Sequence, residues 1–162
     1  MTTWKLTFEN PSDGFAYPSA IAVGTEGEVW VVDPSKQSLC VIAKDAQRSV
    51  RCPIGQADTQ RGFADGAGAA VRIRAQAGLL ALADGSILFA DTGNNRLRKV
   101  RCTGRGGVGC SVTTVAGSGR VGLSLGVAAL ADLPVPSGLA PLSYGRIVVS
   151  DPYHNVLRVV TP

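Results

Sequence analysis

Histidine is almost absent from this sequence, since His154 is the only one among 162 residues. One histidine cannot build a multi-histidine metal site, and the four cysteines show no Cys/His spacing typical of zinc. A Ser-His-Asp triad would have to use the same His154, and the sequence has no nucleophile elbow. We therefore expect no metal, no cofactor, no catalytic residues and no enzymatic activity.

Long apolar runs are also missing, and none approaches the roughly 20 residues of a membrane-spanning helix. The start, Met1-Thr2-Thr3-Trp4, lacks the basic and apolar regions of a signal peptide, so we expect none and no membrane partner. Glycine and proline, in contrast, are abundant. The 20 Gly and 9 Pro separate short runs of four to six apolar residues, which is typical of an all-β chain with frequent turns.

Three segments align when the sequence is compared with itself. Each has an apolar run, a second run that ends in aspartate, and a third run after a short polar turn, and the aspartates lie 58 and 60 positions apart. A fourth strand is predicted over 49–52 and 111–115. Four antiparallel strands per repeat make a propeller blade. The predicted blades of this single domain, 1–162, span about 17–55, 74–117 and 134–162.

Two stretches, Ser86–Val100 and Gly62–Ala70, resemble the NHL-repeat family. With two weaker copies the resemblance covers nearly all of residues 17–160, and it implies an all-β, β-propeller fold. The first copy departs at Pro34–Ser38 and the third at Pro152–Asn155, where the second has Thr-Gly-Asn-Asn-Arg or its equivalent. The resemblance to this family also raises one enzymatic precedent, the metal-dependent lyase propellers. The histidines that bind the metal in those lyases are missing from this sequence.

The aspartates that end the second strands, Asp33, Asp91 and Asp151, are predicted to be structural. A carboxylate at this position can accept hydrogen bonds from the backbone N–H groups of the following turn. Asn95 and Asn155 can do similar work or adopt a left-handed backbone conformation. Three copies at nearly one spacing favour a role in the fold over a catalytic role.

The four cysteines fall into two opposed pairs when the first two repeats are aligned. Strands three and four form a hairpin, and its register places Cys40 opposite Cys52 and Cys102 opposite Cys110. Opposed residues approach to about 4.5–5.5 Å, which is within disulfide range. Two disulfides would favour a secreted or lumenal location, whereas four buried thiols would indicate a reducing compartment. Both alternatives stay open at this point.

The loops between the second and third strands emerge on one face of a propeller, and their sequences differ between the copies. The candidate partner-binding residues there are Lys36, Gln37, Asn94, Tyr153 and His154. The leading hypothesis is a non-catalytic protein-binding or scaffolding module. A second is a nucleic-acid-binding face, since the net charge is +4. A third is a small-ligand or lyase-type propeller that uses the central channel.

The last expectation concerns how the blades close into a propeller ring. Residues 4–8 alternate like a strand and are predicted to act as a fourth strand for the third blade, which would then be split between the two ends of the sequence. Three blades are too few to close a ring, because propellers typically have four to eight. Two copies arranged head to tail would close a six-bladed ring. The rival possibility is that further blades lie in the same natural polypeptide or in another subunit.

Overall fold

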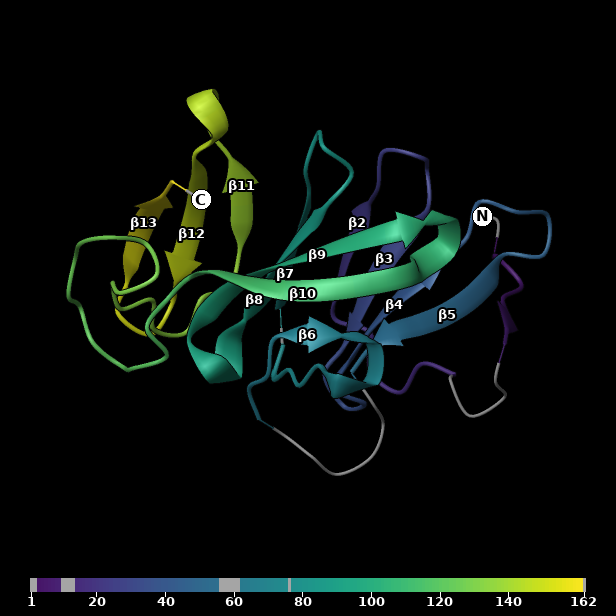
Figure 1. Cartoon of the computed structure of the whole chain (residues 1–162), viewed down its shortest axis with the longest axis horizontal. Helices are drawn as coiled ribbons and strands as arrows, with labels where there is room; N and C mark the ends of the chain where they lie inside the picture. Colours follow the sequence, from purple (N-terminus) through teal and green to yellow (C-terminus); the bar gives the residue numbers. More distant parts are fainter. Residues whose placement is uncertain (1–2, 10–13, 56–61, 76, 162) are drawn as a thin grey trace.

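The chain folds into three sheets, built mainly of antiparallel strands, that stand side by side as propeller blades (Figure 1). A computed structural model describes residues 3–9, 14–55, 62–75 and 77–161. The expected all-β propeller fold and its division into three blades are confirmed. Each sheet is built on a meander, in which consecutive strands pair antiparallel, and the first two sheets add one short strand at the edge.

Blade one contains a four-stranded meander and one added short strand. Its strands are β2 (Ala20–Val23), β3 (Val29–Asp33), β4 (Ser38–Ile42) and β5 (Ser49–Ile54). The short strand β1 (Thr7–Phe8) pairs in parallel with β5 at the edge of the sheet.

Blade two repeats this plan with longer outer strands. Its strands are β7 (Ala77–Ala81), β8 (Ile87–Asp91), β9 (Arg96–Gly104) and β10 (Val108–Ala116), with β6 (Gly66–Ala67) added beyond β10. One-turn 3-10 helices lie at η2 (Gly68–Ala70), η3 (Thr92–Asn94) and η4 (Arg105–Gly107).

Blade three has three strands among the described residues. They are β11 (Leu139–Pro141), β12 (Ile147–Asp151) and β13 (Val156–Val160), with η5 (Ser143–Gly145) between the first two. The sheet order is β11-β12-β13, so β13 is an edge strand. In Figure 1 it lies at one end of the molecule, beside the loop that leads from β10 to β11.

The core has two clusters where one blade packs on the next, and a third in blade one, where Val31 and Val50 pack with Phe8 and Phe15. Between blades one and two, Val32 and Leu39 pack with Phe89 and with linker residue Ile73. Between blades two and three, the buried cluster comprises Leu88, Leu97, Ala116, Leu133, Ile147, Val149 and Val160. Alternating side chains of a strand point to opposite faces of its blade, so the faces between neighbouring blades are buried.

Residues 4–8 take a different place from the one expected. In the single chain, Thr7–Phe8 joins blade one and is not a fourth strand of blade three. The spacing explains this: 23 positions separate Ile54 from Ala77, and Ala116 from Leu139, whereas Phe8 precedes Ala20 by only 12. Thr7–Phe8 thus corresponds to the linker strand β6. Completion of blade three by this segment of a second copy is still only a prediction.

Candidate functional site

The three repeat aspartates are buried at the same end of the blades, but their hydrogen-bond donors differ. In blade one, Asp33 Oδ1 accepts the turn N–H groups of Ser35 and Lys36 at 3.1 and 3.2 Å. Its Oδ2 accepts the N–H groups of Ala16 and Tyr17, in the segment before β2, at 2.6 and 3.1 Å. The carboxylate therefore ties the turn to the chain that enters the blade.

In blade two the aspartate contacts an arginine that is fully buried. Arg98 Nη1 lies 2.9 Å from Asp91 Oδ2, and Arg98 Nε and Nη2 donate to Asp65 Oδ1 at 3.1 and 2.8 Å. The guanidinium also donates to the carbonyl oxygens of Arg72 and Ala64, so all five of its N–H groups have acceptors. Asp65 Oδ2 in turn accepts the N–H of Thr114 from β10 at 2.9 Å.

The residues around Asp91 differ from those predicted for it. Instead of turn N–H groups, it accepts the Asn94 side-chain amide at 2.8 Å and the Arg74 backbone N–H at 2.6 Å. Burial raises the pKa of Asp91, and the donors Asn94, Arg74 and Arg98 oppose that rise. The buried Asp91 and Arg98 and the partly exposed Asp65 thus form a network that holds the linker against the blade.

In blade three a histidine replaces a missing backbone donor. The residue 17 positions before the aspartate is Ala16 in blade one and Arg74 in blade two, but Pro134, which has no N–H, in blade three. His154 Nδ1 lies 2.8 Å from Asp151 Oδ2, while the N–H groups of Tyr153 and His154 bond to Oδ1 at 3.1 Å. The histidine is therefore part of the turn.

The fourth residue after each aspartate adopts the left-handed backbone conformation. Its φ is 53° at Asn95 and 56° at Asn155, as expected, and 50° at Gln37. Gln37 belongs to the same turn and also donates to the Pro34 carbonyl. The end of the fourth strand lies close to this turn. In blade two, a Cβ on Gly117 would clash with the Asn95 carbonyl oxygen.

The candidate partner-binding residues are mostly turned toward their own loops. Gln37, Asn94 and His154 hydrogen-bond within the turn, and Asn94 also donates to the Gly62 carbonyl at 2.8 Å. Lys36 is half-buried. Tyr153 is 71% exposed and packs edge-on against the His154 ring. Their role in binding a partner is untested.

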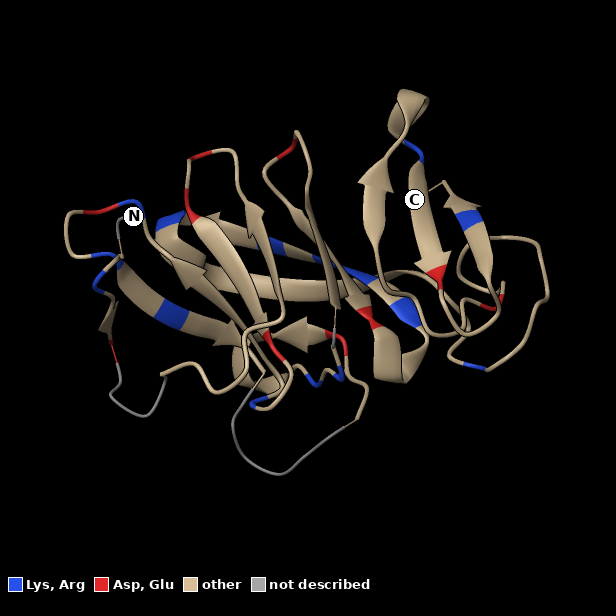
Figure 2. Cartoon of the chain, turned by 180° about the vertical axis from the view of Figure 1, so that it is seen from behind, with Lys and Arg blue, Asp and Glu red and all other residues tan. Residues whose placement is uncertain are grey.

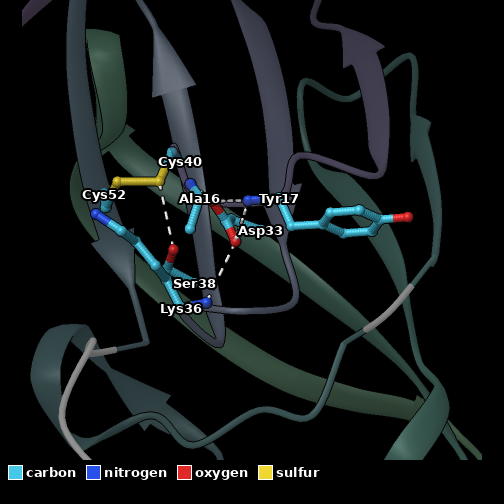
Figure 3. The surroundings of a disulfide bond; sticks show 7 residues. All are labelled: Ala16, Tyr17, Asp33, Lys36, Ser38, Cys40 and Cys52. Atoms are coloured by element: carbon cyan, nitrogen blue, oxygen red, sulfur yellow. Dashed lines mark hydrogen bonds between the residues drawn. A yellow bond between two sulfur atoms is a disulfide. The ribbon is translucent and has the colours of Figure 1, made fainter. Parts of the chain in front are cut away.

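Both opposed cysteine pairs form disulfides, Cys40–Cys52 and Cys102–Cys110. Cys102 and Cys110 are direct partners in the ladder, and Cys40 lies beside a bulge in β4. Figure 3 shows the first disulfide near Asp33 and Ser38, with Ser38 Oγ 3.6 Å from Cys40 Sγ. Cys40 holds the repeat position of Arg98, seven residues after the aspartate. Two disulfides are typical of an oxidising compartment.

A cavity of about 950 Å³ lies at the opposite end of blades one and two. The loops after β2, β7 and β11 are at this end, the upper one in Figure 1. Arg105 Nη2 lies 3.1 Å from Glu26 Oε2, and Arg101 pairs with Asp84. Hydrogen bonds from Ser86, followed by Arg101, lower the pKa of Asp84 to about 2. Charge of both signs lines this cavity, and Figure 2 shows acidic and basic residues interspersed over the visible chain.

Blade three carries an apolar face that is uncovered. Leu39, Leu97 and Leu157 each follow their aspartate by six positions, and the first two are fully buried against the next blade. Leu157 is 73% exposed, and Val159 on the same face is 57% exposed. Beside β13 lies a second cavity, of about 680 Å³, whose walls include Leu125, Leu133 and Arg158.

Residues 3–9, 14–55, 62–75 and 77–161 contain no group of three or more His, Cys, Asp or Glu that could hold a metal ion. Within the same ranges, no helix is long and apolar enough to span a bilayer.

Comparison with known proteins places the chain among propellers. No family model matches it. The chain is similar to Protein SUPPRESSOR OF QUENCHING 1, chloroplastic, from Arabidopsis thaliana, with 30% identity over 154 residues. That alignment covers 90% of this chain but only 14% of the Arabidopsis protein, so the chain spans about one seventh of its length.

Two solved structures share the fold at low sequence identity. An auxiliary nutrient binding protein from Bacteroides thetaiotaomicron has a TM-score of 0.69 and 20% identity, over 86% of this chain and 36% of that chain. A catalytically inactive virginiamycin B lyase from Staphylococcus aureus, solved with quinupristin, has a TM-score of 0.55 and 13% identity, over 95% and 44%. The chain thus has the architecture of part of a six-bladed propeller.

Proposed function

We propose that the chain is an NHL-type propeller segment with a non-catalytic binding role, and that its open face on blade three binds another propeller blade. The observation that carries this proposal is the exposure of Leu157, because the equivalent Leu39 and Leu97 are fully buried. The same repeat position packs against the next blade in both interfaces of the chain. An apolar side chain at a position built for packing favours an interface.

Blade one offers a matching surface on its other side. Ile21 and Val23 on β2 are exposed there, at 68% and 62%. Phe15 stands 18 positions before its aspartate, as Ile73 and Leu133 do, and those two residues are buried between blades. Blade one therefore already carries the linker residue that a preceding blade would cover. Two copies could close a six-bladed ring through two such contacts.

Light scattering after size exclusion tests this closure on the 162-residue chain. We expect a mass about twice 16.7 kDa, falling to that of the monomer in Leu157→Gln. The matched control is Tyr144→Gln, which removes a side chain that is 93% exposed at the β11–β12 loop and should leave the dimer intact. A wild-type chain that stays near 16.7 kDa at every concentration would overturn closure by a second copy.

The two disulfides support a location outside the reducing cytosol, and we place the protein in a secreted or lumenal compartment. Native protein should then show no thiol that can be alkylated before reduction and four afterwards. Mass measurement of native protein with four alkylated thiols would contradict this assignment.

A further inference from the structure

The edge of β13 differs from the equivalent edges of blades one and two. In those blades a fourth strand, β5 or β10, pairs with the third strand. The sheet of blade three ends at β13 among the described residues, and the cavity of about 680 Å³ lies along it. An unpaired strand edge is a template for the addition of another strand.

Arg158 lies on β13 at the repeat position of Arg98, seven residues after the aspartate. Arg98 donates five hydrogen bonds to four acceptor atoms, and two of these bonds are to Asp65 Oδ1. The position of Asp65, 26 residues before the aspartate, holds Leu125 in blade three. Arg158 Nε is buried and has no hydrogen-bond partner within the described part of the chain. A buried guanidinium N–H without an acceptor is costly, so this edge lacks an anionic partner.

The two complete blades specify the strand that fits such an edge. Val50 pairs with Ile42, and Val112 pairs with Val100, which hold the repeat position of Val160. Five positions after each valine comes a glycine, Gly55 or Gly117, where a Cβ would clash with the carbonyl oxygen of the turn residue equivalent to Asn155.

The residue two positions after the valine lies opposite the arginine. In blade two it is Thr114, the ladder partner of Arg98. Opposed residues in an antiparallel pair project to the same face, so an acidic residue here would reach the guanidinium of Arg158. A charge-assisted bond to a carboxylate is the strongest way to satisfy a guanidinium.

We propose that the free edge of β13 binds an extended polypeptide segment of the pattern Val-x-(Asp/Glu)-x-x-Gly, antiparallel to β13, with its carboxylate on Arg158. This inference rests on the proposed function, because such a strand completes blade three of the propeller. No stretch of the 162 residues has this pattern, so this proposal takes the segment from polypeptide outside this sequence and is an alternative to completion of blade three by residues 4–8 of a second copy.

Peptide binding tests the pairing directly. The probe is a fluorescein-labelled peptide with the sequence of residues 107–119, carrying Cys110→Ser and Thr114→Glu. The matched controls carry Thr or Lys at that position. We expect the Glu peptide to bind about 10-fold more tightly than the Lys peptide, as one charge-assisted hydrogen bond predicts. In Arg158→Met the difference between the Glu and Lys peptides should fall below about 2-fold.

All these measurements are made in the Leu157→Gln background, whose substituted side chain lies on the opposite face of β13 from Arg158. Failure of the chain to dimerise therefore leaves this test unaffected. Protection of the β13 backbone N–H groups from hydrogen exchange should appear with the Glu peptide. Equal affinity of the Glu and Lys peptides, a preference that survives in Arg158→Met, or no binding by any peptide would each overturn the proposal.

Discussion

Blades two and three bury an aspartate at the same repeat position and place an arginine seven residues after it, yet the two arginines have different surroundings. Arg98 has no exposed surface and satisfies all five of its donors. Arg158 is half-buried, and its Nε has no partner in the described part of the chain. An arginine at the same repeat position therefore has a structural role in blade two, whereas in blade three it has a donor left for a binding partner.

The difference originates in the linkers. The linker before blade two supplies Asp65, and the linker before blade three supplies Leu125 at that position, with Pro134 where blade two has the N–H donor Arg74. Blade one departs further, because Cys40 replaces the arginine and forms a disulfide. A repeat fold thus keeps the buried aspartate while its partners change from blade to blade.

The largest expected effect separates the two arginines. Arg98→Met should lower the free energy of unfolding by about 3–5 kcal/mol, because it leaves the Asp91 carboxylate buried without its cation. Arg158→Met should change it by less than about 1 kcal/mol, since Arg158 forms no ion pair with the described residues. Urea denaturation of both variants checks this. Equal losses of unfolding free energy in the two variants would contradict this. They would show that the repeat position, and not the acidic partner, decides how much the arginine stabilises the fold.

The disulfide of blade one should make the next largest contribution to the free energy of unfolding. Closing its loop, with a sequence separation of 12, stabilises by about 3 kcal/mol on chain-entropy grounds. The double variant Cys40→Ala/Cys52→Ala should lose more than Cys102→Ala/Cys110→Ala, because Cys40 is fully buried and holds the position that Arg98 occupies in blade two. Thermal and urea unfolding of the two oxidised variants measure the order. A larger loss in blade two would contradict the comparison.

Sequence reasoning reached the fold because three copies of one pattern rarely arise from anything but a repeat. It also reached the cysteine register and the left-handed conformation of Asn95 and Asn155, because hairpin pairing and turn geometry are local. It missed two partners of Asp91, Arg74 and Arg98, which come from a linker and the next strand. A signal was present, since an arginine follows the aspartate by seven positions in two of the three copies.

The turn residue Gln37 and the strand Thr7–Phe8 show what residue type alone does not reveal. The type of Gln37 differs from that of Asn95 and Asn155, which favours a variable surface residue, but its position in the repeat and its left-handed backbone are the same. The apolar alternation of Thr7–Phe8 predicts a strand but does not say which blade it joins within one chain. The 23-residue spacing between one blade's last strand and the next blade's first strand assigns it to a linker. Position in a repeat is thus more informative than residue type.

The histidine of blade three allows a smaller test. His154→Ala should cost about 1–2 kcal/mol, because Asp151 loses a side-chain donor that replaces the missing N–H of Pro134. In a Pro134→Ala background a backbone N–H returns, and the cost of His154→Ala should fall by at least about half. The double-mutant cycle is measured by urea denaturation. A cost that is unchanged by Pro134→Ala would show that the two residues do not compensate each other.

The smallest effect concerns the hairpin tips at the other end of the blades. Asp84, Glu26 and Tyr144 hold the same position, seven residues before the repeat aspartate, and each precedes a glycine with positive φ. Ser86 donates to Asp84 from its backbone at 3.0 Å and from its hydroxyl, and these bonds, followed by Arg101, lower the pKa of Asp84 from 3.8 to about 2. A carboxyl group whose pKa is lower in the folded state contributes stability above its unfolded pKa and loses it as the pH falls through the folded value.

Asp84→Asn, which mimics the neutral carboxyl group, should therefore destabilise the protein at pH 7 and make little difference near pH 2. The side chain is 45% exposed, so solvent screening limits the expected loss to about 0.5 kcal/mol. The matched control is Glu26→Gln, because Glu26 holds the same tip position and pairs with Arg105 across two exposed side chains. Its effect should be close to zero at both pH values, since exposed ion pairs contribute little. Urea midpoints of the three proteins at pH 7, 4 and 2.5 measure the difference. If Asp84→Asn loses as much at pH 2.5 as at pH 7, the loss comes from the changed turn and not from the charge of Asp84.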